Sequence, residues 1–198
     1  MKNQLICLPE NDQHKRFILA KKGKKNLLVI GLNPSTANEK ALDSTSKNIN
    51  QIALNNGFDG WLLVNLYPQR SSKPVDLDIT EDKTLFWQNI HWIKHILDRD
   101  QFQIHEAWLC WGDGVDTMGR YYLKQAAGYL YRELKDFKFS YNVIGTTRSG
   151  NPCHPSPQSV NCHIGPVDKV KFEKFDFQNY VKSVKLEPEI KLNGLEFK

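Results

Sequence analysis

Residues 26–35, NLLVIGLNPS, set the architecture expected of this chain. The first half is a continuous apolar run, which is typical of a strand buried on both faces in a parallel sheet. The run ends at Gly31, and the turn after it carries Asn33 and Ser35 on either side of a proline. In an open α/β sheet, ligands bind at the edge formed by the carboxyl ends of the strands. This turn is therefore a first candidate for a functional site.

Segments typical of strands and of helices alternate after this run. Further apolar runs indicate strands at residues 61–64, 107–111 and 139–144. Apolar residues at helical spacing indicate amphipathic helices at residues 44–57, 80–97 and 123–134. Such alternation predicts parallel strands joined by right-handed crossovers. We expect an α/β fold with three layers, α/β/α, around a central, mostly parallel four-stranded sheet.

The chain of 198 residues is long enough for one domain with a sizeable core. We expect an N-terminal extension or edge hairpin over residues 1–25 and an α/β domain over residues 26–164. Lysines are frequent in residues 165–198, for which we expect a basic C-terminal helix and tail packed on the same domain.

Composition and charge exclude several classes of protein. With 40% hydrophobic residues, the chain is not typical of a disordered protein. No apolar run approaches the ~20 residues of a membrane helix, and the first residues lack the apolar core of a signal peptide. We expect a cytoplasmic monomer without membrane association. The net charge of +5 suits a polyanionic partner such as DNA.

The four cysteines do not indicate a metal site, because no two of them have C-x-x-C spacing. Cys153 and Cys162 are each followed by a histidine, but adjacent residues rarely point at one metal ion and the usual ligand spacing is absent. Reduced thiols are the expected state in a cytosolic protein.

Two more strand ends carry polar residues. Asn65 directly follows the run at 61–64, and the proline-stiffened segment HPSPQS at residues 154–159 follows the run at 139–144. An asparagine at a strand end is also a common turn residue, and a histidine in a loop is often only a surface residue. Asn33, Asn65 and His154 nevertheless fall at three separate strand ends, which parallel strands bring to one edge.

The segments GLNPS at residues 31–35 and HPSP at residues 154–157 resemble the two active-site motifs of the uracil-DNA glycosylase superfamily. The asparagine in the first motif is similar to the mismatch-specific branch (GINPG) rather than to the uracil-specific branch (GQDPY). This resemblance implies a glycosylase-like fold. It also implies a DNA glycosylase that hydrolyses the N-glycosidic bond of a damaged or modified base flipped out of DNA. No metal or organic cofactor is implied.

The resemblance also implies a role for each polar residue at the strand ends. Asn33 would orient water, because an amide cannot accept a full proton. His154 would donate a hydrogen bond to the base as negative charge develops on it. Asn65 would read the Watson–Crick edge of the base. Apart from the resemblance, Tyr67 could supply an aromatic surface for stacking the base, although such residues more often belong to the core. Asp43 could serve as a general base, although it could equally cap a helix.

Six residues are candidates for DNA contacts: Ser35, Thr36, Arg70, Arg148, Ser156 and Gln158. Ser156 resembles the motif serine that contacts a backbone phosphate. Gln158 departs from the superfamily pattern, in which leucine or arginine fills the gap left by the flipped base. The two arginines could equally be solvated loop charges. The DNA could be double- or single-stranded.

A closer resemblance covers about residues 26–160. The segments GLNPSTA, DST, VNLY and GNPCHP are similar to those of an uncharacterised family from bacteria and phages, which has no settled activity. Its association with phages adds the hypothesis that the substrate is a modified phage base and that the protein acts in phage defence.

Two other functions are compatible with the same residues. A non-catalytic protein of this fold could bind nucleic acid, an alternative favoured by Gln158 and by the absence of a carboxylate in the first motif. An enzyme acting on free nucleosides or nucleotides would cleave the same bond without needing DNA.

Overall fold

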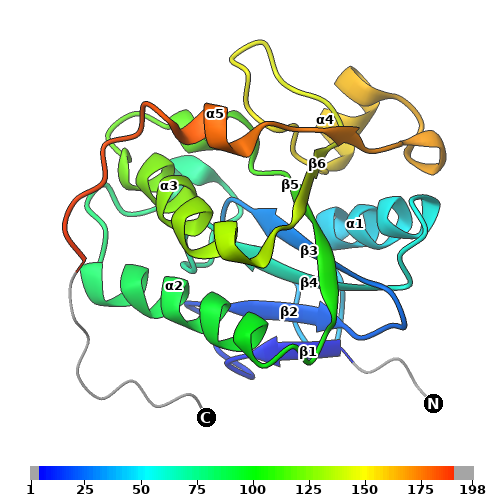
Figure 1. Ribbon diagram of the computed structural model, residues 1–198, viewed down its shortest axis with the longest axis horizontal. Coiled ribbons are helices and arrows are strands. Elements are labelled where there is room, and N and C mark those ends of the chain that lie inside the picture. The colour runs from blue at the N-terminus through cyan, green and yellow to red at the C-terminus, as the bar shows by residue number, and fades with distance from the viewer. Residues whose placement is uncertain (1–4, 190–198) are drawn as a thin grey trace.

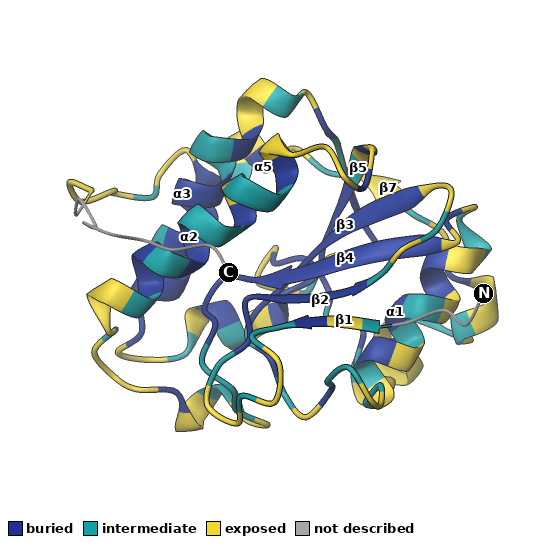
Figure 2. Ribbon diagram, turned by 90° about the horizontal axis from the view of Figure 1, so that it is seen from below, coloured by how far each residue is buried: buried dark blue, intermediate teal, exposed yellow. Residues whose placement is uncertain are grey.

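The computed structural model describes residues 5–189, and within them seven strands form one mixed sheet in the order β1-β2-β4-β3-β5-β6-β7 (Figure 1). The strands are β1 (Leu5–Leu8), β2 (Ile18–Lys21), β3 (Asn26–Gly31), β4 (Gly60–Asn65), β5 (Ile104–Leu109), β6 (Ser140–Val143) and β7 (Glu173–Lys174). The apolar run in residues 26–35 forms the middle strand, β3, and every residue of β3 and β4 is buried (Figure 2).

The prediction of a four-stranded, mostly parallel sheet is wrong. Strands β4, β3, β5 and β6 do pair in parallel, but β1, β2 and β7 add antiparallel pairs at both edges. These edge strands have four, four and two residues. Segments this short show little periodicity, and their place in the sheet depends on distant partners, so the predicted four-stranded sheet did not include them.

The helices cover both faces of the sheet. They are α1 (Ser44–Asn55), α2 (Lys83–Asp98), α3 (Tyr122–Leu134), α4 (Pro157–Ser159) and α5 (Phe177–Val181). Shorter 3₁₀ segments lie at Pro74–Asp76, Gly112–Asp116, Lys135–Phe137 and Val167–Lys169, with a π-helical turn at Val160–Ile164. Helix α1 packs on one face of the sheet, and α2, α3 and α5 pack on the other. The predicted amphipathic helices are thus explained by burial of their apolar stripes.

Segments near both ends of the described chain pack against this core. Residues 5–8 and 18–21 form the antiparallel edge pair β1–β2, and α5 packs beside α3 through Phe177 and Val181. Residues 1–4 and 190–198, which include part of the expected basic tail, lie outside the described residues. Between residues 5 and 189, no helix combines the length and apolar character that crossing a membrane requires.

Candidate functional site

A cavity of about 400 Å³ lies at the carboxyl ends of the central strands, on the face that α1 covers. Pockets for small molecules have volumes of roughly 300–1,000 Å³. The predicted site residues that line this cavity are Asn33, Ser35, Asp43, Asn65, His154, Ser156 and Gln158. They come from four separate segments of the chain, and strand ends of the parallel part of the sheet bring these segments together.

Asn65 lines this cavity and is only 2% exposed. It pairs in the sheet with Gly31, where a Cβ atom would come within 2.9 Å of the Asn65 Oδ1 atom. The glycine therefore leaves the space that the amide occupies. The buried Nδ2 atom has no hydrogen-bond partner in residues 5–189. Leaving such a donor unpaired costs about 1–3 kcal/mol, which an acceptor on a ligand would recover.

Asn33 is held in one orientation by the loop that follows β4. Its Nδ2 atom donates to the carbonyl of Ser71 at 2.9 Å and to that of Pro34 at 3.1 Å. Within the described part of the chain, no group donates to its Oδ1 atom. The amide therefore presents an acceptor, which can orient a water molecule but cannot take its proton.

His154 has a defined tautomer. Its Nδ1 atom accepts a hydrogen bond from the backbone N–H of Ser156 at 3.1 Å. The proton of the neutral ring is therefore on Nε2, which is a donor. Burial lowers the pKa of His154 to about 4, and the negative charge of Asp43 only partly opposes this shift. At neutral pH the side chain is a neutral hydrogen-bond donor.

Asp43 caps helix α1. Its Oδ1 atom accepts from the backbone N–H of Ser46 at 2.8 Å, and its Oδ2 atom accepts from that of Ala37 at 3.3 Å. The positive end of the helix favours a carboxylate at this position. Of the two roles considered for Asp43, helix capping is the one visible in the structure, and the capped carboxylate also lines the cavity.

Tyr67 and Arg148 do not line this cavity. Tyr67 is fully buried and packs against Tyr122, with ring centroids 4.9 Å apart and the ring planes tilted by 57°. Its hydroxyl accepts a hydrogen bond from the backbone N–H of Asp82. Burial raises the pKa of Tyr67 to about 12. It belongs to the core and leaves no ring face for a base. Arg148 is exposed in the loop between β6 and α4.

Arg70 and Thr36 line a neighbouring polar cavity, which shares Ser35, Ser71 and Ser72 with the first one. The Nη1 atom of Arg70 donates to the carbonyls of Ser35 at 2.6 Å and Ala37 at 3.0 Å. The guanidinium thereby joins the loop after β3 to the loop after β4. Its main visible contribution is to fix these two loops, which carry Asn33 and its partners.

Two charged residues that were not predicted as site residues also line the cavity, Arg16 and Asp113. Arg16 is 2% exposed and immediately precedes the apolar residues leading into β2. Asp113 belongs to a Gly-Asp-Gly turn directly after the apolar run at 107–111. For Asp113, the usable signal was a polar residue directly after a buried strand, whereas Arg16 precedes its strand and carried no such signal.

The cavity shows neither an activated thiol nor a metal site. Cys110 lines it, but burial raises the pKa of this thiol, so it stays protonated and is a poor nucleophile. Among residues 5–189, no three His, Cys, Asp or Glu side chains lie close enough together to hold a metal ion. The chemistry available here is hydrogen bonding by amides and an imidazole, beside carboxylates and one guanidinium.

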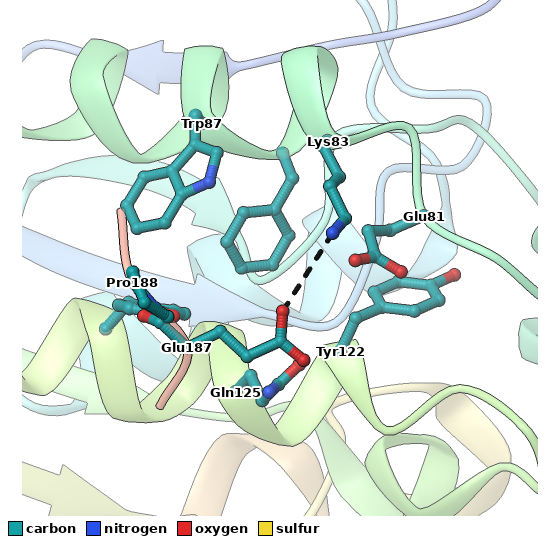
Figure 3. Close-up of a pocket in the computed structure, with 9 residues that line it drawn as sticks. Glu81, Lys83, Trp87, Tyr122, Gln125, Glu187 and Pro188 are labelled. Atoms are coloured by element: carbon teal, nitrogen blue, oxygen red, sulfur yellow. Dashed lines mark hydrogen bonds and ion pairs between the residues drawn. The ribbon is translucent and has the colours of Figure 1, made fainter. Parts of the chain in front are cut away.

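A second pocket lies between α2 and α3 (Figure 3). Glu187 and Pro188 of the C-terminal segment cover it, and Glu187 pairs with Lys83 at 4.0 Å. Its volume of about 40 Å³ is a tenth of that of the first cavity. It has space for water rather than for a ligand, so the cavity at the strand ends is the better candidate.

The fold and the cavity define an α/β protein with a polar site, large enough for a small molecule, at the carboxyl edge of its sheet. A family model described as "Protein of unknown function (DUF1643)" matches residues 16–156, and the chain belongs to that family. The match begins at Arg16 and includes every residue of the cavity lining except Gln158. No curated protein matches the chain. The description of the family states no activity, and the cavity is the feature of this chain that bears on function.

Proposed function

We propose that this protein is a DNA glycosylase-type hydrolase that cuts the N-glycosidic bond of a damaged or modified base held in the cavity. The observation that supports this most is the unpaired, buried amide of Asn65 in a cavity that Asn33 and His154 also line. An amide can pair with the amide-like edge of a base through one donor and one acceptor. The Nδ2 donor of this amide has no partner in residues 5–189, and the hydrogen bond from Asn89 goes to the backbone carbonyl of Asn65, not to its side chain.

The other two residues supply what bond cleavage needs. The sugar passes through an oxocarbenium-like state while negative charge develops on the departing base. The Nε2–H of His154 would donate to a base oxygen, and a ring with a pKa of about 4 does so as a neutral group that keeps its proton. Asn33 Oδ1 would orient the water whose hydroxyl is added to the anomeric carbon, while the water's other proton goes to the base or to solvent.

The expected partner is DNA, double- or single-stranded. The net charge of +5 favours a polyanion. Ser156 and Gln158, which line the cavity, would contact the strand. A base modified by a phage remains within this proposal. Four free cysteines support a reducing compartment, and we propose the cytoplasm as the location.

One observation favours a non-catalytic role instead. Both carboxylate oxygens of Asp43 already accept backbone hydrogen bonds, so this acid is poorly placed to take a proton from water. A protein that holds a flipped base without cutting its bond would use Asn65 and His154 in the same way.

An oligonucleotide panel separates these possibilities. Single and double strands carrying uracil, mismatched thymine, hydroxymethylated or glucosylated pyrimidines are incubated with the protein, and alkali-labile abasic sites are measured. The wild type should release at least one base, His154→Ala should not, and His163→Ala, which changes an exposed histidine, should behave like the wild type. Absence of abasic sites on every substrate would overturn the glycosylase proposal, and tight binding without cleavage would favour the non-catalytic role.

A further inference from the structure

Arg16 is a buried cation in the cavity to which the proposed reaction gives no role. It precedes β2, and its backbone N–H donates to the carbonyl of Pro68 at 2.9 Å, just after β4. Across the sheet edge the order β2-β4-β3-β5-β6 places Arg16 beside the strand of Asn65 and far from the strand that leads to His154. Arg16 therefore marks one end of the cavity.

The guanidinium of Arg16 is poorly satisfied by the protein. Its Nη1 atom donates to the carbonyl of Ala37 at 2.8 Å, whereas its Nε atom is buried without any partner in residues 5–189. No carboxylate of the described chain forms an ion pair with it. The charge of Asp43 acts on it only from a distance, and the neighbouring Arg70 adds a second positive charge. Burial and Arg70 lower the pKa of Arg16 to about 10, which leaves it protonated at neutral pH.

Another buried arginine shows what a purely structural role looks like. Arg120 is 7% exposed, and its Nε, Nη1 and Nη2 atoms all donate to backbone carbonyls, those of Leu77, Met118 and Val75. Arg16 is more deeply buried and lines a cavity, yet its Nε atom stays unpaired. Burying a charge without a counter-charge is costly, and an anion in the cavity would remove that cost.

We propose that the Arg16 end of the cavity binds an anionic oxygen group of the ligand, a carboxylate or a phosphate, next to the edge held by Asn65. A guanidinium presents a planar fork of N–H donors that matches such groups. Where the ligand is taken to be a nucleobase, this inference rests on the proposed function and restricts the substrate to one that carries an anionic group. The group is then either an acidic substituent on the base or the phosphate of a nucleotide.

Calorimetric titrations with matched probes test this. Uracil is compared with orotate, which adds a ring carboxylate, and uridine is compared with uridine 5′-monophosphate, with inorganic phosphate as a fifth probe. We expect at least one anionic probe to bind tenfold or more tightly than its neutral partner, and the pair that shows this identifies the source of the anion. Equal affinity within both pairs, or no binding of any anionic probe, would overturn the inference.

Variants assign the effect to Arg16. Arg16→Gln should lose the preference for the anionic probe, Arg16→Lys should keep part of it, and Arg99→Gln, which changes an exposed arginine at the end of α2, should keep all of it. A preference that survives in Arg16→Gln contradicts the proposal. If Arg16→Gln does not fold, the paired probes measured on the wild type and on Arg16→Lys still test the proposal. Base release without anion preference refutes only this inference, whereas anion binding without base release refutes only the proposed function.

Discussion

Two asparagines at the same edge of the sheet are buried equally and bonded very differently. Asn151 is 1% exposed, and its Nδ2 atom donates to Asp113 and to Asp116 at 2.7 Å each, while its Oδ1 atom accepts from the hydroxyl of Tyr180 at 2.6 Å. Asn65 is 2% exposed, and its Nδ2 atom has no partner in the described protein.

Under the proposed function, Asn151 stabilises the fold through its hydrogen bonds, whereas Asn65 keeps its amide free for a ligand. The Asn151 network, which consists of Asp113, Asp116, Thr147, Asn151 and Tyr180, ties the loops after β5 and β6 to α5 by hydrogen bonds within the protein. In the cavity, by contrast, the donors Asn65 Nδ2 and Arg16 Nε and the acceptor Asn33 Oδ1 have no hydrogen-bond partner in the described residues. A buried donor without a partner reduces the stability of the folded protein. Its presence in a cavity therefore favours the interpretation that a ligand supplies the missing acceptor.

The largest effect is expected from removing the imidazole of the cavity. His154→Ala should lower kcat for base release roughly 10²–10³-fold, because it removes a donor to charge that develops in the transition state. KM should change little, since the interaction strengthens only in that state. Steady-state kinetics on the best oligonucleotide checks this, and a change confined to KM would contradict the role given to His154.

Breaking the Asn151 network should damage stability instead. Asn151→Leu leaves Asp113, Asp116 and Tyr180 without their shared partner, and the unfolding free energy should fall by about 2–3 kcal/mol. Urea denaturation measures this. A stability equal to that of the wild type would show that these hydrogen bonds do not hold the loops.

Acid should weaken the folded state through His154. The unfolded imidazole takes up a proton near pH 6.5, whereas burial lowers the pKa of the folded one to about 4, so protonation favours the unfolded state. This contribution is complete above pH 6.5 and is lost as the pH falls toward 4. The stability advantage of the wild type over His154→Gln should shrink by about 1–2 kcal/mol across that window. If the unfolding free energies of the two proteins change with pH in parallel, the lowered pKa of the His154 ring is refuted.

The smallest change in stability is expected at Asn65. Asn65→Leu removes an unpaired buried amide, and the unfolding free energy should stay the same or rise by up to ~1 kcal/mol. Base release should nevertheless be lost, because leucine cannot form hydrogen bonds with the edge of the base. Thermal unfolding and the release assay together check this. A strongly destabilised variant would mean that Asn65 is bonded within the protein after all.

The centre of the fold was predictable because its strands and helices show a clear local pattern of apolar residues. Residues 26–31 and 60–65 are continuous apolar stretches, and Phe86, Ile90, Ile93 and Leu97 mark the buried stripe of α2. The edge strands were undercounted because β2 is defined by its pairing with β4, as in Leu19 with Leu63, which lies 44 residues further along the chain. Pairing at such separation leaves no trace in local periodicity.

The site was predictable in part for a similar reason. Asn33, Asn65 and His154 follow strands of the parallel centre, whose carboxyl ends meet at one edge. Arg16 was missed because it precedes a strand, β2, that runs antiparallel to the centre and so brings its start to that edge. Tyr67 follows the same strand as Asn65, yet it points into the core.

The most direct test of the account follows the side-chain amide signals of Asn65 and Asn151 by NMR while free uracil, or the base identified in the release assay, is titrated into the protein. We predict that the Nδ2 protons of Asn65 shift downfield and become protected from exchange as the base binds, while those of Asn151, already bonded to Asp113 and Asp116, stay unchanged. If the Asn65 signal does not move while the base binds, or is protected before any base is added, the cavity is not where the protein holds a base.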